Sequence, residues 1–140
     1  MSKAAMNIRY KSGYKYVLVD PCTIRTGILV GRIIHTPFIL MDHGGLLMVR
    51  PGYAWDGASG PAFDTDSFMR GSLVHDALYQ LMRDGLLEQK YRQHADWLLV
   101  EICKQDGMCW IRRQWVYWAV RMFGRINLRQ NEIFTAPRPA

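Results

Sequence analysis

The chain has 140 residues, a formal net charge of +6 and 49% hydrophobic residues. This length suits one domain that folds unaided, and the hydrophobic content excludes an intrinsically disordered protein. Because no stretch approaches the ~20 apolar residues that span a bilayer, and the first residues lack an apolar core, we expect no transmembrane segment, no secretory signal and folding in a cytoplasm.

The first half of the chain has the pattern of short β-strands. Four runs rich in aromatic and branched residues predict strands at residues 14–19, 24–30, 33–41 and 46–50. The last two flank Asp42-His43-Gly44-Gly45, whose two glycines can adopt positive φ, so we expect a hairpin turn there. A polar loop follows over residues 51–61.

The second half of the chain has helical periodicity. Helices are expected at about residues 64–83, 88–104 and 110–123. A glycine follows each of them, and Gly124 is expected to end the third.

Strands followed by helices predict an α+β fold: a small N-terminal antiparallel β-sheet followed by three C-terminal α-helices. No repeat or linker divides the chain, so we expect a single domain over residues 1–140. Its ordered core is expected at about residues 9–125, with a loose tail at 126–140.

A histidine and three further polar residues are the strongest candidates for chemistry. His75 and Asp76 are neighbours on a predicted helix, so their side chains point about 100° apart and cannot face each other. Asp96, in the next helix, can reach His75 if the two helices pair antiparallel. A histidine oriented by a carboxylate can act as a general base on water. The alternative is a core histidine tied to Asp96 that joins the two helices.

The polar loop offers a candidate metal site. Asp56 and Ser59 could form an oxygen-rich wall for calcium or magnesium beside Asp76, or could simply bond backbone amides within a turn. A zinc site from His75, His94 and Asp96 is a further alternative, although its spacing matches no known zinc signature.

The three cysteines are an odd number without metal-type spacing, and we expect them to be reduced. A Cys103–Cys109 bridge is the alternative, and it needs an oxidising compartment.

The third helix is both aromatic and basic. Trp115, Trp118 and Met122 follow a helical stripe, for which core packing is the first explanation. Arg112, Arg113 and Arg121, joined by Arg125, are expected to form an exposed basic stripe beside it, either solvated or in contact with an anionic partner. No sequence-specific nucleic-acid binding is expected, because no known recognition motif is present.

Four motifs occur in the order of a known family. They are residues 52–61, His75-Asp76-Ala77-Leu78-Tyr79, Ala95-Asp96 and residues 117–124. Together they resemble a family of small proteins of tailed bacteriophages and prophages that is catalogued as a domain of unknown function. The resemblance covers roughly residues 14–124 and implies a phage origin, but no activity.

The residues around His75 also resemble, more distantly, the secreted phospholipases A-two. In those enzymes a His-Asp-x-x-Tyr helix faces an aspartate on an antiparallel helix, and a glycine-containing loop lies upstream. The resemblance implies that His75 is the base, that Asp96 orients it and that Tyr79 supports Asp96 through its hydroxyl. It also implies that Asp76 binds calcium together with the loop. The chain departs from that disulfide-rich, exported family in having three cysteines and no secretion signal.

The leading hypothesis is a phage-encoded protein with a hydrolase-like, phospholipase-like site at His75, Asp96 and Tyr79, acting on an ester or phosphoester, with lipid as the first substrate class. Calcium at Asp76 and Asp56 is an optional addition. The alternative is a non-enzymatic virion, tail-assembly or host-interaction protein in which the same cluster is structural. The expected partners are anionic lipid or a phage or host protein, in the host cytoplasm or on the virion.

Overall fold

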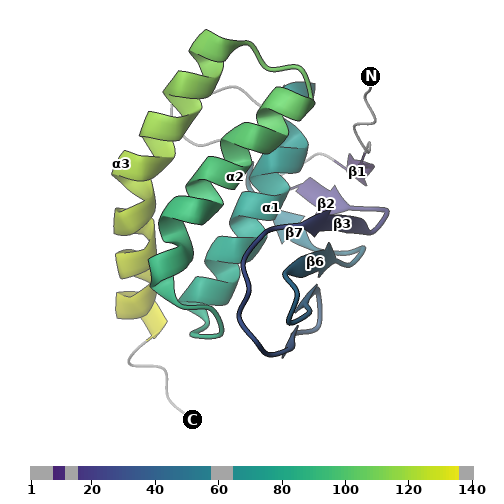
Figure 1. Ribbon diagram of the computed structural model, residues 1–140, viewed down its shortest axis with the longest axis vertical. Coiled ribbons are helices and arrows are strands. Elements are labelled where there is room, and N and C mark those ends of the chain that lie inside the picture. Colours follow the sequence, from purple (N-terminus) through teal and green to yellow (C-terminus); the bar gives the residue numbers. More distant parts are fainter. Residues whose placement is uncertain (1–7, 12–15, 58–64, 136–140) are drawn as a thin grey trace.

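The computed structural model describes residues 8–11, 16–57 and 65–135. Antiparallel sheets occupy the first half of the chain and three α-helices the second, which confirms the predicted α+β fold. The helices lie side by side and the strands gather on one side of them (Figure 1).

The strands form two small antiparallel sheets. The first has the order β1-β2-β7, with β1 at Tyr10–Lys11, β2 at Tyr16–Leu18 and β7 at Ala54–Trp55. The second has the order β3-β6-β5-β4, with β3 at Cys22–Arg25, β4 at Ile34–His35, β5 at Ile39–Met41 and β6 at Leu46–Val49.

Two predicted strands are shorter than expected, because threonine side chains turn the chain. After β3, the Thr26 hydroxyl donates to the Gly45 carbonyl and accepts from the Ile28 N–H, so the strand does not continue to residue 30. The expected strand at 33–41 is two strands, β4 and β5. Thr36 joins them in a tight turn, in which its hydroxyl accepts from the Ile39 N–H.

The predicted hairpin between β5 and β6 is confirmed. The Asp42 carboxylate accepts the N–H groups of Gly44 and Leu46 at 2.9 Å, and these bonds lower the pKa of Asp42. Of the two turn glycines only Gly45 has a positive φ, at 88°. A Cβ there would also lie 2.7 Å from the Ile28 carbonyl oxygen, so glycine is required at this position.

Three α-helices follow, with α1 at Asp66–Arg83, α2 at Arg92–Gln105 and α3 at Trp110–Thr135; a short 3-10 turn, η1, precedes α2 at Gln89–Tyr91. The prediction that the third helix ends at Gly124 is wrong, because α3 continues to Thr135. A loose tail from residue 126 stays a prediction. A glycine inside a helix costs only about 1 kcal/mol relative to alanine. Close packing around Gly124 offsets that cost. Residues 136–140 of the predicted tail lie outside the described part of the chain.

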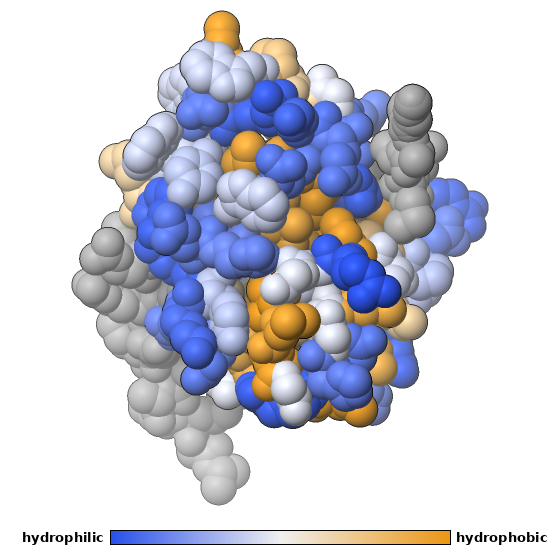
Figure 2. All heavy atoms as spheres, viewed as in Figure 1, coloured by the Kyte–Doolittle hydropathy of each residue, from blue (hydrophilic) through white to orange (hydrophobic). Residues whose placement is uncertain are grey.

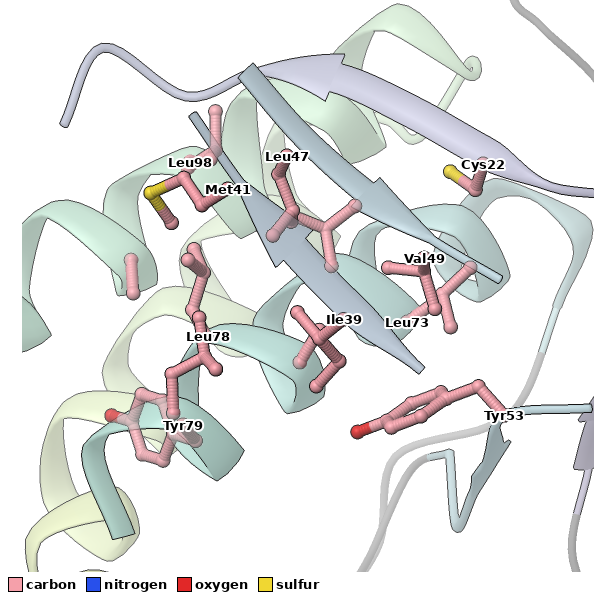
Figure 3. Close-up of a cluster of buried hydrophobic side chains, with 14 of the residues drawn as sticks. Cys22, Ile39, Met41, Leu47, Val49, Tyr53, Leu73, Leu78, Tyr79 and Leu98 are labelled. Carbon is pink, nitrogen blue, oxygen red and sulfur yellow. The ribbon is translucent and has the colours of Figure 1, made fainter. Parts of the chain in front are cut away.

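The main core lies between α1 and the second sheet. Leu73 and Leu78 of α1 point towards the sheet, where Ile39 and Val49 meet them (Figure 3). Each such fully buried aliphatic side chain contributes about 1.5–3 kcal/mol. A smaller cluster joins the three helices and contains Phe68, Leu99, Cys103, Met108 and Val116.

The outward face of α3 differs from expectation. Trp115, Trp118 and Met122 were expected in the core but are exposed, and α3 instead turns Val116 towards the other helices.

Hydrophobic residues also reach the surface over the segment between β3 and β4, beside α2, in a face otherwise covered largely by hydrophilic residues (Figure 2). Among the described residues, no helix combines the length and the apolar character needed to cross a membrane.

All three cysteines are free thiols, as expected. Cys103 is buried and Cys109 is exposed, so the alternative of a bridge between them is not realised. Burial raises the pKa of Cys22 to about 11 and that of Cys103 to about 12, which keeps both thiols protonated and unreactive at neutral pH.

Candidate functional site

Helices α1 and α2 approach closely, and this approach sets up the site. A Cβ on Gly71 would lie 2.9 Å from Leu99 Cδ1 and 3.0 Å from Cys103 Sγ, so only glycine allows the two helices this distance. His75 follows Gly71 by one turn and Asp96 precedes Leu99 by one turn. The same close contact therefore carries His75 to Asp96.

A buried ion pair fixes the register of the same two helices. Arg70, near the start of α1, donates through Nε and Nη2 to the two carboxylate oxygens of Asp106, just past the end of α2, at 3.1 and 3.0 Å. The two side chains are only 6% and 10% exposed. A bidentate pair of this kind joins the start of one helix to the end of the other, as an antiparallel arrangement requires.

Asp96 is the centre of the site. It is completely buried, and its Oδ1 lies 2.7 Å from His75 Nε2 and 2.7 Å from the Tyr79 hydroxyl. The predicted contact between His75 and Asp96 is thus present, together with the support from Tyr79 that the resemblance implied. Tyr79 stands at the edge of the apolar cluster with its hydroxyl pointing away from it (Figure 3).

The charge on Asp96 is stabilised by its donors. Burial by itself raises the pKa of Asp96, but hydrogen bonds from His75, Tyr79 and Arg121 outweigh that effect and hold the pKa below its usual range. The pKa of Tyr79 is raised, first by burial and then by its bond to Asp96, so the tyrosine remains a donor. Asp96 is therefore an ionised acceptor at neutral pH.

An ionised Asp96 determines the tautomer of His75. A carboxylate only accepts, so Nε2 of His75 carries the hydrogen and the lone pair of the neutral ring lies on Nδ1. Within the described part of the chain Nδ1 has no hydrogen-bond partner. The side chain keeps 11% of its surface exposed, and Nδ1 is not among the fully buried unpaired atoms. Asp96 therefore orients the ring through Nε2, and the described residues leave Nδ1 without a partner.

Two arginines of the site were not identified from the sequence. Arg121 of α3 donates through Nη1 to Asp96 Oδ2 at 2.9 Å. The prediction that Arg121 belongs to an exposed basic stripe is therefore wrong. Arg92 places Nη1 3.6 Å from the same oxygen. The spacing of Arg92 and Asp96 by four residues was a signal for this pair. Arg121 was noted only within the motif at residues 117–124 and the basic stripe, and nothing in the sequence linked it to Asp96 in another helix.

Arg113 does not form the expected basic stripe either. Its Nη1 donates to the backbone carbonyl of Met108 at 2.6 Å, which holds the start of α3 against the turn that follows α2. The expected stripe therefore loses both Arg113 and Arg121 to contacts inside the molecule.

Asp76 lies beside the histidine and meets the polar loop, as predicted. Burial raises the pKa of Asp76, and the charge of Asp56 raises it further, whereas His75, Arg83 and a hydrogen bond from the Asp56 backbone lower it. Asp56 and Asp76 are therefore neighbours. Ser59, the other predicted loop ligand, lies outside the described residues.

Only two of the predicted metal ligands come together among the described residues. Over the described ranges, no group of three or more His, Cys, Asp or Glu side chains is placed to hold a metal ion. His94, considered for zinc, instead bonds the Thr26 carbonyl through Nε2 at 2.6 Å and does not join His75. Asp56 and Asp76 remain as two carboxylates, and the calcium site implied by the resemblance stays a prediction.

A family model matches residues 33–120, more than half of the chain, and its family is described as a protein of unknown function, DUF1353. The match contains His75, Asp76, Tyr79 and Asp96 and stops one residue before Arg121. No curated protein and no solved structure gives a significant match to the chain.

Proposed function

The chain belongs to the DUF1353 family of proteins of unknown function. We propose that it is a hydrolase in which His75 activates water. The observation that carries the proposal is the state of the imidazole. Asp96 Oδ1 holds Nε2 at 2.7 Å, while Nδ1 has no partner in the described part of the chain. General-base catalysis needs an oriented histidine whose second nitrogen is not bound by the protein.

The proposed step uses only residues of this site. Nδ1 of His75 takes a proton from water, and the water oxygen attacks the carbonyl carbon of an ester. The bond from that carbon to the alcohol oxygen then breaks, and His75 returns the proton to the leaving oxygen, which gives an acid and an alcohol. Asp96 keeps the ring oriented and stabilises the imidazolium between the two transfers.

Tyr79 and Arg121 position Asp96 in this proposal and do not touch the substrate. Tyr79 shares Oδ1 with His75, and Arg121 binds Oδ2, so both oxygens of the carboxylate are fixed. Calcium at Asp76 and Asp56 would supply a positive charge for a developing oxyanion, but the step above does not require it. The substrate class, a phospholipid ester, rests on the resemblance to the phospholipases A-two.

Hydrolysis assays with a matched histidine variant test the proposal. Wild type, His75→Gln and the control His94→Gln are compared on p-nitrophenyl esters and on phosphatidylcholine and phosphatidylglycerol vesicles, with fatty-acid release as the readout. We expect His75→Gln to lose activity by about 10²–10⁴-fold. His94→Gln should keep it, because His94 bonds Thr26 away from the site. Equal rates for all three proteins would refute hydrolysis by His75.

A second candidate is a non-enzymatic role in a phage virion, in tail assembly or in host interaction. The observation that favours it is the burial of Asp96, which accepts from residues of α1 and α3 and lies 3.6 Å from Arg92 of α2, as a structural cluster would. This candidate predicts that His75→Gln, Tyr79→Phe and Arg121→Met lower the melting temperature together. The proposed hydrolase instead predicts that His75→Gln removes activity from a protein that remains folded.

A further inference from the structure

The outer surface of α3 carries a continuous line of exposed apolar side chains, termed here the outer stripe. Its members are Ile111, Trp115, Trp118 and Met122, and Trp110 is exposed beside them at the first residue of the helix. Each is between 59% and 69% exposed. Helix α3 is the helix farthest from the strands (Figure 1), so the outer stripe lies on the outside of the bundle. Soluble monomers rarely expose so many large apolar residues together without using them for binding.

The outer stripe is separate from the Asp96 site, although both use α3. Ile111, Trp115, Trp118 and Met122 are spaced by four, three and four residues, which places them on one face of the helix. The opposite face packs Val116 against the other helices, and Arg121 reaches Asp96 from its flank. The stripe therefore contributes nothing to the core or to the candidate catalytic residues.

A second copy of the chain fits this stripe poorly. Helix pairing through such a seam needs apolar residues sustained over three or four heptads. Continuing the same spacing along the sequence reaches Arg125 and then Arg129. The apolar spacing therefore ends at Met122, short of the length that such a seam needs.

Charge favours an anionic occupant. Besides Arg113 and Arg121, which are bound inside the molecule, the sequence of residues 110–135 has arginine at 112, 125 and 129 and one acidic residue, Glu132. These residues are part of a chain whose formal net charge is +6. Tryptophan combines an apolar ring with an N–H donor and is favoured where an apolar layer meets water. A helix with a tryptophan-rich face and a basic character is typical of helices that lie on a membrane surface.

We propose that the outer stripe of α3 docks the protein on an anionic lipid bilayer, with the helix lying in the headgroup layer. The proposal rests on the exposed tryptophans and on the charge of α3, and it does not depend on hydrolysis by His75. It replaces the expected contact through Arg113 and Arg121, which are used inside the molecule. The helix binds to the surface without crossing it.

Vesicle flotation with matched variants tests the docking. The full chain is mixed with phosphatidylcholine vesicles with and without phosphatidylglycerol, at low and high salt. Trp115→Gln/Trp118→Gln is compared with Leu29→Gln/Ile33→Gln, which removes two exposed apolar side chains from the β3–β4 segment instead. We expect binding to the anionic vesicles alone, weakened by salt. The tryptophan variant should bind about tenfold or more weakly, since two large apolar contacts are lost.

Three outcomes would overturn the proposal. One is an absence of binding to anionic vesicles at low salt, which would leave an acidic protein as the occupant to seek. Another is equal loss of binding in both double variants. The third is a wild-type dimer in sedimentation equilibrium that Trp115→Gln/Trp118→Gln converts to monomer, because that result assigns the stripe to a second copy. All variants change exposed residues, so we expect each of them to melt at the wild-type temperature.

Discussion

At the scale of single residues, Asp96 organises the site through its two oxygens. One oxygen accepts from His75 and Tyr79, and the other faces two arginines. A completely buried carboxylate is tolerated only when it is paired and hydrogen-bonded. The arginines also limit what the carboxylate does for His75, because they share its charge. Asp96 therefore orients the imidazole chiefly through geometry.

Removing Asp96 should cost far more stability than removing one of its donors. Asp96→Ala leaves Arg121 and Arg92 without their anion in a buried place, so we expect a loss of about 3–5 kcal/mol in urea unfolding. Tyr79→Phe removes only one hydrogen bond and should cost about 1 kcal/mol. A loss for Asp96→Ala no larger than that for Tyr79→Phe would contradict the central role of Asp96.

The contribution of Asp96 should also depend on pH. Its pKa in the folded state lies below the unfolded value of about 3.9, so its charge stabilises the fold fully above that value. The stability is lost as the pH falls through the folded pKa. The stability difference between wild type and Asp96→Asn should therefore be constant near neutrality and shrink in acid. Thermal unfolding at a series of pH values measures it, and a difference that grew in acid would reverse the assigned sign.

Asp76 should behave in the opposite way, because burial raises its pKa in the folded state. The ionised form is then a cost to folding, and the cost grows as the pH rises from about 3.9 through the folded pKa. Asp76→Asn keeps an acceptor for the Asp56 backbone but carries no charge. We expect this variant to match wild type in acid and to melt at a higher temperature near neutrality. A neutral-pH melting temperature at or below that of wild type would show that the charge of Asp76 is compensated.

At the scale of elements, glycines decide which helices can meet at the site. Gly71 allows α1 and α2 to touch, and Gly124 allows α3 to approach Tyr79. A Cβ at residue 124 would lie 2.4 Å from the Tyr79 hydroxyl oxygen. Because Arg121 precedes Gly124 by less than one turn, the same approach carries its guanidinium to Asp96.

Gly124→Ala should therefore destabilise the protein, although alanine is the better helix former by about 1 kcal/mol. The added methyl group overlaps the Tyr79 hydroxyl, and overpacking of this kind costs about 1–3 kcal/mol. Tyr79→Phe removes the atom that would be struck, so Gly124→Ala should cost less in that background. A double-mutant cycle in urea measures the coupling. Additive effects would mean that α3 shifts away freely, and that its position on Tyr79 is not fixed.

At the scale of the whole molecule, the sequence predicted the local features but did not predict which face of α3 packs against the other helices. The α+β order and the hairpin at Asp42 follow from patterns within short segments, and the pairing of His75 with Asp96 follows from the antiparallel packing of two consecutive helices. The face that α3 buries does not, since both of its faces carry apolar residues. Buried Asp96 needs a cation and Gly124 permits close contact, so the face beside Arg121 packs inward and the tryptophans remain outside.

At the scale of the whole molecule, calcium binding can be measured through the melting temperature of the protein. If calcium binds between Asp56 and Asp76, it stabilises the folded state alone and raises the melting temperature. At a hundred times its Kd, calcium would add about 2.7 kcal/mol. The effect should weaken as the pH falls, because the ion needs an ionised Asp76 and burial has raised the pKa of that group.

Scanning calorimetry of chelator-stripped protein, with and without millimolar calcium, makes the measurement. Asp76→Asn is the matched control, because it keeps the shape of the side chain and removes its charge. We expect a shift in wild type and none in the variant. A wild-type protein that melts at the same temperature in both conditions would remove calcium from the site and leave Asp56 and Asp76 as neighbours joined by the hydrogen bond from the Asp56 backbone.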